Sequence, residues 1–243
     1  GTEDDIAART IDKLHDQIRA PRVVTSLESA ELIKYAANAF LATKISFINE
    51  IANLAERVGA DVRHVSEGIG HDHRIGPHFL RAGIGYGGSC FPKDVSALAQ
   101  ISGSNGYTFK LLASVIEVNN RQRVMFFKEI KDKLGSLKGR KIGVWGLAFK
   151  PDTDDIRESA AIDIAQRLVA HGAELSVYDP EAQKNAQEML PDHVTFAPTA
   201  IDAATGAEAL IVLTEWPEFQ NVSFPTLKSR MIDPVIFDGR NCL

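Results

Sequence analysis

The period of the hydrophobic pattern changes near residue 137, and this change limits the folds that the chain can adopt. Before it, apolar residues recur every three or four positions through 26–58 and 108–134, which predicts long amphipathic helices. After it come short apolar runs typical of buried strands, at 141–145, 175–179, 209–213 and 235–238. A helical pattern at 159–169 separates the first two runs. Strands that alternate with helices predict a parallel sheet covered on both faces.

These patterns predict an α/β protein with an all-helical domain at 26–137 and a Rossmann-like parallel-sheet domain at 138–243. The 243 residues, of which 44% are apolar, are enough to bury two cores. Residues 1–20 have a polar start and an amphipathic helical pattern, followed by a β-type run at 23–25. No upstream strand is available to pair with that run. We therefore expect residues 1–25 to be the remnant of another domain, in a chain cut out of something longer.

Composition argues against several classes of protein. No apolar run approaches the roughly 20 residues that cross a bilayer, and the opening residues 1–5 are acidic, unlike a signal peptide. We therefore expect a cytoplasmic protein that does not bind membranes. The net charge of -5 argues against nucleic acid as a main partner, because phosphate binding favours a basic face.

Neither the cysteines nor the histidines form a structural or metal-binding pattern. Cys90 and Cys242 lie far apart in different contexts, so no disulfide framework is predicted. The loop 71–78 holds three histidines but no cysteine partner and no helical His pair, so no metal is predicted. A single cysteine in a glycine-rich loop is instead a candidate nucleophile.

The long helical stretches hold more Leu, Phe and Ile than one small helical domain buries. An exposed apolar surplus on a helix indicates a partner surface. We therefore expect a homodimer formed through the central helices, with 26–137 as the dimerisation domain.

The glycine-rich stretch Gly87-Gly-Ser-Cys90-Phe-Pro-Lys-Asp94 is the first candidate site. Glycines permit a close backbone approach, a helix begins near Pro92, and Lys93 adds positive charge, which together favour a thiolate at Cys90. Asp94, one helical turn further on, could activate a water at a thioester. A cysteine that is merely packed in a glycine turn fits the same residues, so this motif by itself leaves both interpretations open.

Lys34 and Asn38 form the second candidate site. They stand one helical turn apart on an otherwise apolar segment, so one rigid face could direct both at an oxyanion. A solvated lysine beside a locally bonded asparagine is the alternative.

The turn after the first predicted strand is a weak nucleotide signal. A dinucleotide fingerprint runs G-x-G-x-x-G directly into a helix, whereas here Gly143 and Gly146 are three apart and Phe149 follows. Lys150 and Arg157 could supply charge to a phosphate, or could pair with the neighbouring aspartates.

Taken together, these residues resemble the UDP-glucose/GDP-mannose dehydrogenase family. The resemblance runs in order over nearly the whole chain and is carried by Lys34–Phe40, Arg74-Ile-Gly, Gly85–Asp94, Gly146–Lys150, Asp152-Thr153, Arg157-Glu-Ser159 and Phe237–Arg240. The stretch around Cys90 is highly specific, which raises the functional interpretation of that cysteine.

The resemblance implies an enzyme that uses NAD twice to oxidise the C6 alcohol of UDP-glucose to a carboxylate. Cys90 would hold the intermediate as a thiohemiacetal and then as a thioester. Lys34 and Asn38 would stabilise oxyanions at C6, and Asp94 would assist the water that hydrolyses the thioester. The product, UDP-glucuronate, would belong to nucleotide-sugar metabolism and polysaccharide biosynthesis.

The resemblance also implies the binding residues. The UDP-sugar would contact Lys34, Asn38, Arg74, Arg81, Tyr86, Gly87, Phe149, Lys150 and Arg240. Arg74 would reach across the dimer into the neighbouring site. NAD would contact Cys90, Lys93 and Arg157, and 138–243 would be the UDP-sugar-binding domain.

Family members begin with a G-x-G-x-x-G Rossmann domain that binds NAD, and residues 1–25 resemble only its last elements. This chain alone is therefore expected to bind NAD poorly and to turn over little. GDP-mannose 6-dehydrogenase, UDP-N-acetylmannosamine dehydrogenase and an inactive UDP-binding dimerisation module stay open as alternatives. Ser89 before Cys90 favours UDP-glucose, because the aminosugar group usually has His there. The joint presence of Lys34, Asn38, Cys90 and Asp94 argues against the inactive module.

Overall fold

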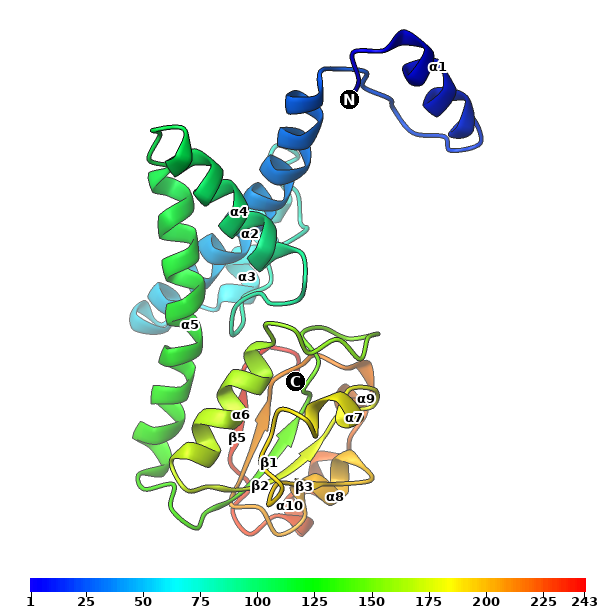
Figure 1. The fold of residues 1–243 in the computed structure, drawn as a ribbon. Coiled ribbons are helices and arrows are strands. Elements are labelled where there is room, and N and C mark those ends of the chain that lie inside the picture. The colour runs from blue at the N-terminus through cyan, green and yellow to red at the C-terminus, as the bar shows by residue number, and fades with distance from the viewer.

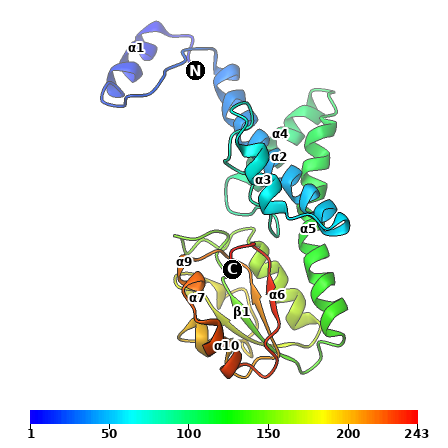
Figure 2. The ribbon, with the colours of Figure 1, turned by 180° about the vertical axis from the view of Figure 1, so that it is seen from behind.

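A computed structural model describes residues 1–243 as a helical part, a sheet part and an arm at the N-terminus (Figure 1). The helical part consists of α2 (Leu27–Val58), α3 (Val62–Gly70), α4 (Phe91–Ser104) and α5 (Lys110–Leu134). α2 packs against both α4 and α5, and α3 lies beside α2, as the view from behind also shows (Figure 2). The long helices predicted at 26–58 and 108–134 are confirmed.

α2 begins and ends where the sequence supplies capping residues. The Ser26 hydroxyl accepts a hydrogen bond from the Ser29 N–H at 3.2 Å, which satisfies one of the free donors at the helix start. Gly59 ends the helix with φ 73°, a left-handed conformation that glycine adopts without steric cost.

The sheet part is a five-stranded sheet in which every pairing is parallel, in the order β3-β2-β1-β4-β5. Its strands are β1 (Lys141–Trp145), β2 (Glu174–Tyr178), β3 (Thr195–Phe196), β4 (Ala209–Val212) and β5 (Ile236–Asp238). This order reverses direction at β1 and β4, as in doubly wound nucleotide-binding folds. The predicted α/β class and parallel sheet are confirmed.

Helices cover both faces of this sheet, and α6 and α10 lie on opposite faces (Figures 1 and 2). They are α6 (Ala160–Ala170), α7 (Gln183–Ala186), α8 (Ala200–Ala204), α9 (Pro217–Gln220) and α10 (Phe224–Arg230). α8 approaches β1 closely, because Gly143 has no side chain to meet the Ala203 carbonyl. The buried Trp145 indole N–H donates to the Ala200 carbonyl at 2.7 Å, which fixes α8 over the sheet.

α5 belongs to both parts of the molecule. Leu112 and Val115 near its start lie in the core of the helical part. Phe127, Ile130 and Leu134 near its end lie in the main core, with the strands and α6. The chain therefore passes from one core to the other inside a continuous helix.

The arm holds α1 (Asp5–Leu14), which buries no residue and projects away from the rest of the molecule (Figure 1). The helix is shorter than the pattern over 1–20 predicted. The β-type run at 23–25 is not a strand, so that prediction was wrong. Its backbone has no neighbouring strand to bond with, and β-branched residues do not form a stable strand without one.

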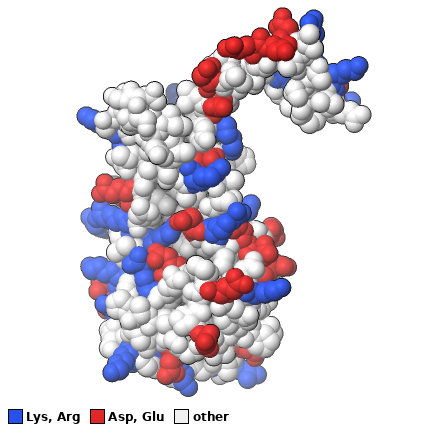
Figure 3. Space-filling view, viewed as in Figure 1, with Lys and Arg blue, Asp and Glu red and all other residues white.

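Acidic side chains gather along the arm, whereas on the rest of the face seen in Figure 3 basic and acidic groups are interspersed. None of the helices is both long enough and apolar enough to span a membrane.

Candidate active site

The glycine-rich loop before α4 lies directly against the sheet domain. The Gly88 N–H donates to the Arg157 carbonyl at 2.9 Å. A side chain on Gly87 would collide with the Glu158 carbonyl oxygen, and one on Gly88 would come within 2.6 Å of the Phe149 ring. Gly88 also has φ 83°. Glycine is therefore needed at both positions for the two domains to touch.

α5 holds the same loop from another direction. The side-chain oxygen of the buried Asn119 accepts from the Tyr86 N–H at 2.8 Å, and its amide donates to the Tyr86 carbonyl at 3.2 Å. One turn further along, Arg123 donates through Nη2 to the carbonyls of Tyr86 and Glu158, at 3.2 Å each. The loop is therefore fixed by side chains as well as by its own backbone.

Cys90 is exposed and stands at the N-cap position of α4, with its Sγ 3.7 Å from the Ser89 hydroxyl. The pKa of Arg157 is raised, chiefly by its hydrogen bond to Asp155 and to a smaller extent by an electrostatic contribution from Cys90. An accessible thiol at a positive helix end and beside a guanidinium has the surroundings of a reactive cysteine.

Asp94 is buried one turn along α4 and lies among the other predicted catalytic residues. The Asn38 amide donates to Asp94 Oδ2 at 2.6 Å, and Lys34 Nζ lies 3.9 Å from the same oxygen. Lys93 Nζ lies 3.3 Å from Oδ1. The Asp94 N–H donates to the Cys90 carbonyl at 2.9 Å. The packing of α2 on α4 thus brings the two separately predicted motifs together.

A pocket of about 240 Å³, here called the loop pocket, opens between the glycine-rich loop and the sheet domain. Most residues that the resemblance implies for the UDP-sugar line it: Arg81, Tyr86, Gly87, Phe149, Lys150 and Arg240. The sheet contributes from segments beyond the carboxyl ends of β1, β4 and β5. Open parallel sheets bind ligands at that edge, where the strand order reverses.

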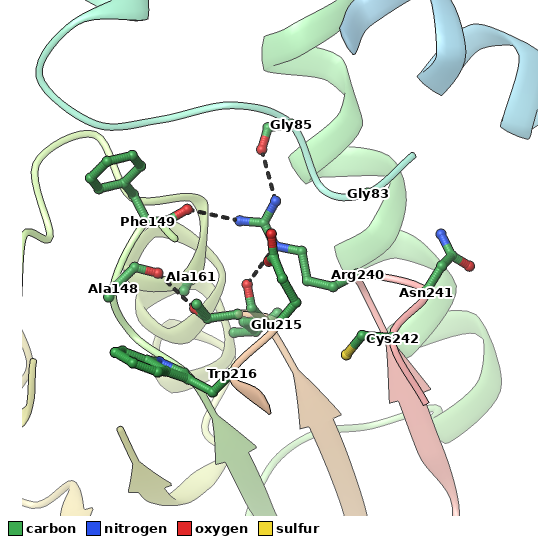
Figure 4. Close-up of polar contacts among 12 residues, drawn as sticks. Gly83, Gly85, Ala148, Phe149, Ala161, Glu215, Trp216, Arg240, Asn241 and Cys242 are labelled. Atoms are coloured by element: carbon green, nitrogen blue, oxygen red, sulfur yellow. Dashed lines mark hydrogen bonds and ion pairs between the residues drawn. The ribbon is translucent and has the colours of Figure 1, made fainter. Parts of the chain in front are cut away.

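Arg240 connects the walls of this pocket (Figure 4). Its Nε donates to the Leu213 carbonyl at 2.8 Å, Nη1 to Gly85 at 3.3 Å and Nη2 to Phe149 at 3.4 Å. Glu215 Oε2, a buried oxygen without a hydrogen bond, lies 3.3 Å from Arg240 Nε. Burial lowers the pKa of Arg240, and the charge of Glu215 opposes that shift.

The turn after β1 does not offer free amides to a phosphate. The Asp179 carboxylate accepts from the N–H groups of Leu147 at 2.6 Å and Ala148 at 3.0 Å, and from the Trp216 indole at 3.1 Å. Dinucleotide-binding turns use such amides for the pyrophosphate. The weak dinucleotide signal of this turn thus has a structural cause.

A second hollow, here called the outer groove, has a volume of about 880 Å³. It is lined by Lys93, Arg123 and Arg157 and by Tyr86, which also lines the loop pocket. Lys93 and Arg157 are the two cations that the resemblance implies for NAD. Arg157 Nη2 lies 2.7 Å from Asp155 Oδ2, so Arg157 forms the ion pair with a neighbouring aspartate that the sequence had left open as an alternative.

Arg74 lines neither cavity, and neither do the catalytic candidates Lys34, Asn38, Cys90 and Asp94, whereas Lys150 lines the loop pocket. Arg74 is exposed and bonded to Asp72, and its reach into a partner's site stays a prediction. Lys150 has its Nζ 5.5 Å from the centre of the Phe149 ring, and it is not paired with an aspartate. The chain holds no group of three or more His, Cys, Asp or Glu placed to share a metal ion.

Asn119, Arg123 and Glu215 were not predicted from the sequence. A signal for the first two was present, because positions 112, 115, 119 and 123 share one face of a helix whose other members are apolar and buried. Polar side chains on a core face indicate a buried hydrogen-bonded site. Glu215 had no comparable signal, since it follows a buried strand like many surface residues.

The fold and these cavities define an α/β protein in which the loop that carries an accessible cysteine packs against a domain built on a five-stranded parallel sheet. Residues 28–121 match the central domain of the UDP-glucose/GDP-mannose dehydrogenase family, and 143–243 match the UDP binding domain of the same family. The chain belongs to the UDP-glucose/GDP-mannose dehydrogenase family.

Its relatives include two proteins of Bacillus subtilis (strain 168). The chain is 49% identical to UDP-glucose 6-dehydrogenase YwqF over 242 residues, 100% of this chain and 55% of the relative. It is 52% identical to UDP-glucose 6-dehydrogenase TuaD over 235 residues, 97% of this chain and 51% of the relative. A solved UDP-glucose dehydrogenase from Pyrobaculum islandicum superimposes with a TM-score of 0.93 at 39% identity, covering 100% of this chain and 54% of that one. The chain thus spans about half the length of the relatives that it matches.

Proposed function

We propose that this chain forms the sugar-nucleotide-binding and cysteine-bearing half of a UDP-glucose 6-dehydrogenase, which oxidises UDP-glucose to UDP-glucuronate with NAD. The observation that carries the proposal is the shared loop, since residues 85–87 line the loop pocket and Cys90 follows within the same segment. The names of the relatives at about half identity support UDP-glucose over the other sugar nucleotides.

In this proposal the UDP part occupies the loop pocket. Lys150 and Arg240 offer positive charge to the diphosphate, and Arg240 keeps two N–H groups free beyond the three that bond to carbonyls. The sugar then extends past Gly87 toward Cys90. A buried guanidinium held by carbonyls is rigid, so it can orient the diphosphate without further ordering.

Cys90 carries the covalent steps. The C6 alcohol first loses a hydride and a proton to give the aldehyde. Cys90 Sγ then adds to C6, forming a C–S bond, and loss of a second hydride and a proton converts this thiohemiacetal into a thioester. Water attacks the thioester carbonyl and the C–S bond breaks, which releases the carboxylate and restores the thiol.

The cluster around Asp94 supports these steps. Lys34 and Asn38 donate to the C6 oxygen when it carries negative charge, and Asp94 accepts a proton from the attacking water. The 2.6 Å bond from Asn38 and the 3.9 Å approach of Lys34 to Asp94 support this assignment, because they hold donors and base in one cluster next to the start of α4.

NAD, when bound, supplies the hydride acceptor for both oxidations. Lys93 and Arg157 fit its nearer end, since both line the outer groove together with Gly88 and Ser89, which directly precede Cys90. The chain's own sheet does not fit the pyrophosphate, because Asp179 already takes the amides of the first turn. We therefore assign Cys90, Lys93 and Arg157 to the nicotinamide side only, and expect weak NAD binding by this chain alone.

We also infer a homodimer through α2. Ile33, Phe40, Phe47 and Leu54 recur every seven residues and are 54%, 66%, 53% and 54% exposed. Apolar residues with this spacing form a continuous seam that suits a second helix.

Calorimetric titration of this chain with UDP-glucose, GDP-mannose and UDP-N-acetylmannosamine tests the substrate. We expect heat from UDP-glucose alone, weakened about tenfold or more in Lys150→Ala and Arg240→Lys, because each loses a charge-assisted contact to phosphate. Lys228→Ala, which removes an exposed lysine of α10, is the control and leaves binding unchanged. Equal binding of all three ligands, or preference for GDP-mannose, contradicts the assignment.

A further inference from the structure

We infer that Arg123 is a positioning residue that keeps the glycine-rich loop seated on the sheet domain, so that the loop pocket and the outer groove share one fixed wall. Arg123 belongs to neither of the motifs assigned above. The inference goes beyond the proposed function, and it rests on that function only for the identity of the ligand used to probe the loop pocket.

The contacts of Arg123 span the boundary between the two domains. Its Nη2 donates to the carbonyl of Tyr86, in the glycine-rich loop, and to the carbonyl of Glu158, in the sheet domain, at 3.2 Å each. Asn119 does not do this, because both of its bonds go to Tyr86 and neither reaches the sheet domain. Asn119 therefore bonds the loop to α5 alone, whereas Arg123 bonds both the loop and the sheet domain to α5.

Arg240 makes the matching contact from the loop pocket. Its Nη1 donates to the carbonyl of Gly85 and its Nη2 to the carbonyl of Phe149 (Figure 4). Two successive loop carbonyls, at residues 85 and 86, are therefore each joined by one guanidinium to a carbonyl of the sheet domain. Arg240 comes from the sheet domain and Arg123 from α5, so the pair holds the loop through two separate elements.

The two arginines face different cavities. Arg123 lines the outer groove and not the loop pocket, while Arg240 lines the loop pocket and not the outer groove. Tyr86 lines both. The loop is thus a partition between the two cavities, and its position on the sheet determines the shape of each.

The burial of Arg123 Nε argues that this position is held for the guanidinium group. That nitrogen is buried without a hydrogen-bond partner. A buried donor left unpaired is unfavourable, so a side chain chosen for packing alone would not carry one there. The two hydrogen bonds that Arg123 Nη2 donates to carbonyls offset this cost.

The experiment compares Arg123→Gln and Arg123→Lys with the parent chain and with Arg140→Gln. Arg140 is a matched control, because it bonds to Glu208 at 2.7 Å and to the Ser136 carbonyl at 2.9 Å, away from both cavities. Two quantities are measured for each protein: hydrogen exchange of the Gly88 amide, which bonds to the Arg157 carbonyl, and UDP-glucose affinity.

In Arg123→Gln we expect Gly88 exchange to rise, and UDP-glucose affinity to fall, by about tenfold or more, as the loss of charge-assisted hydrogen bonds implies. Arg123→Lys keeps the charge and recovers part of both losses. Arg140→Gln lowers the melting temperature but leaves both quantities at parent values, which separates positioning from general destabilisation.

Unchanged Gly88 exchange in Arg123→Gln overturns the inference, whatever ligand the parent binds. Raised exchange with parent affinity also overturns it, because the loop pocket would then not depend on the two contacts made by Arg123. If the parent chain does not bind UDP-glucose, the proposed function fails, and the exchange measurement still decides whether Arg123 seats the loop.

Discussion

Gly88 meets a strict steric condition near the site, together with a positive φ. A methyl group there would lie 2.6 Å from the Phe149 ring, on a backbone with φ 83°. We predict that Gly88→Ala lowers the free energy of unfolding by roughly 1–3 kcal/mol and weakens UDP-glucose binding, because strain and collision add. Denaturant unfolding and calorimetry measure the two effects.

Gly103→Ala is the control for that substitution, since nothing lies within 4 Å of a methyl group at that position near the end of α4. It is expected to be neutral or stabilising by up to about 1 kcal/mol, because alanine is the better helix former. Equal stability of the two variants would contradict the steric argument.

The two cysteines differ in environment, which allows a test by thiol labelling. Burial, followed by the charges of Asp238 and Glu215, raises the pKa of Cys242 to about 12. We predict that a thiol reagent at pH 8 modifies the exposed Cys90 first, and that UDP-glucose slows that reaction. Mass spectrometry of the modified peptides gives both rates, and Cys90→Ser removes the fast phase.

The same shift has a consequence for stability. The raised pKa means that the native state favours the neutral Cys242 thiol. The contribution of this thiol to the free energy of unfolding is fully present below the pKa of the unfolded thiol, about 8.5. That contribution is lost as the pH rises through the native pKa of about 12. Labelling of both cysteines at equal rates in the native chain at pH 8 would show that Cys242 is not protected.

At this scale the sequence predicted residue types better than roles. Cys90, Asp94, Lys34 and Asn38 stood out because each departs from the pattern around it. Arg240 entered only through the family resemblance, since its bonds to three carbonyls depend on long-range packing. Arg123 could not be assigned for the same reason, because its partners lie 37 and 35 positions away.

Among the elements, α2 presents the clearest unpaired surface. We predict that the double substitution Phe40→Asp and Phe47→Asp gives a monomer in sedimentation equilibrium, because it places two charges in the apolar seam. Ile232→Asp changes an exposed isoleucine outside that seam and keeps the parent's dimeric mass. A parent chain that is already monomeric would contradict the proposed dimer.

Elements with strong periodicity were predictable, and short ones were not. The helices α2 and α5 and the strands β1, β2, β4 and β5 follow from apolar spacing that local sequence displays. β3 and α7 to α10 span seven residues or fewer, too short for a period to be visible. The run at 23–25 shows the converse, because β-branched residues predict a strand only where a neighbouring strand exists.

At the scale of the whole molecule, the two cores are joined through α5 and through the glycine-rich loop. We predict that they unfold together. Trp145 and Trp216 are both buried in the main core, so their fluorescence reports the unfolding of the sheet part. The circular dichroism signal of helices reports mainly the unfolding of the helical part. The two signals should give coincident denaturant transitions. Helical signal that persists after the tryptophans are exposed would contradict this prediction.

The continuous course of α5 also restricts how the molecule can move. Its 25 residues form a rod of about 37 Å at the usual rise, embedded in one core at its start and in the other at its end. Two-domain enzymes commonly open at a flexible hinge between domains. Here the connection between the two cores is a helix, so a swinging motion would have to break its backbone hydrogen bonds. We therefore expect ligands to enter and leave through smaller displacements of the loop at 83–89, while the two domains keep their relative positions.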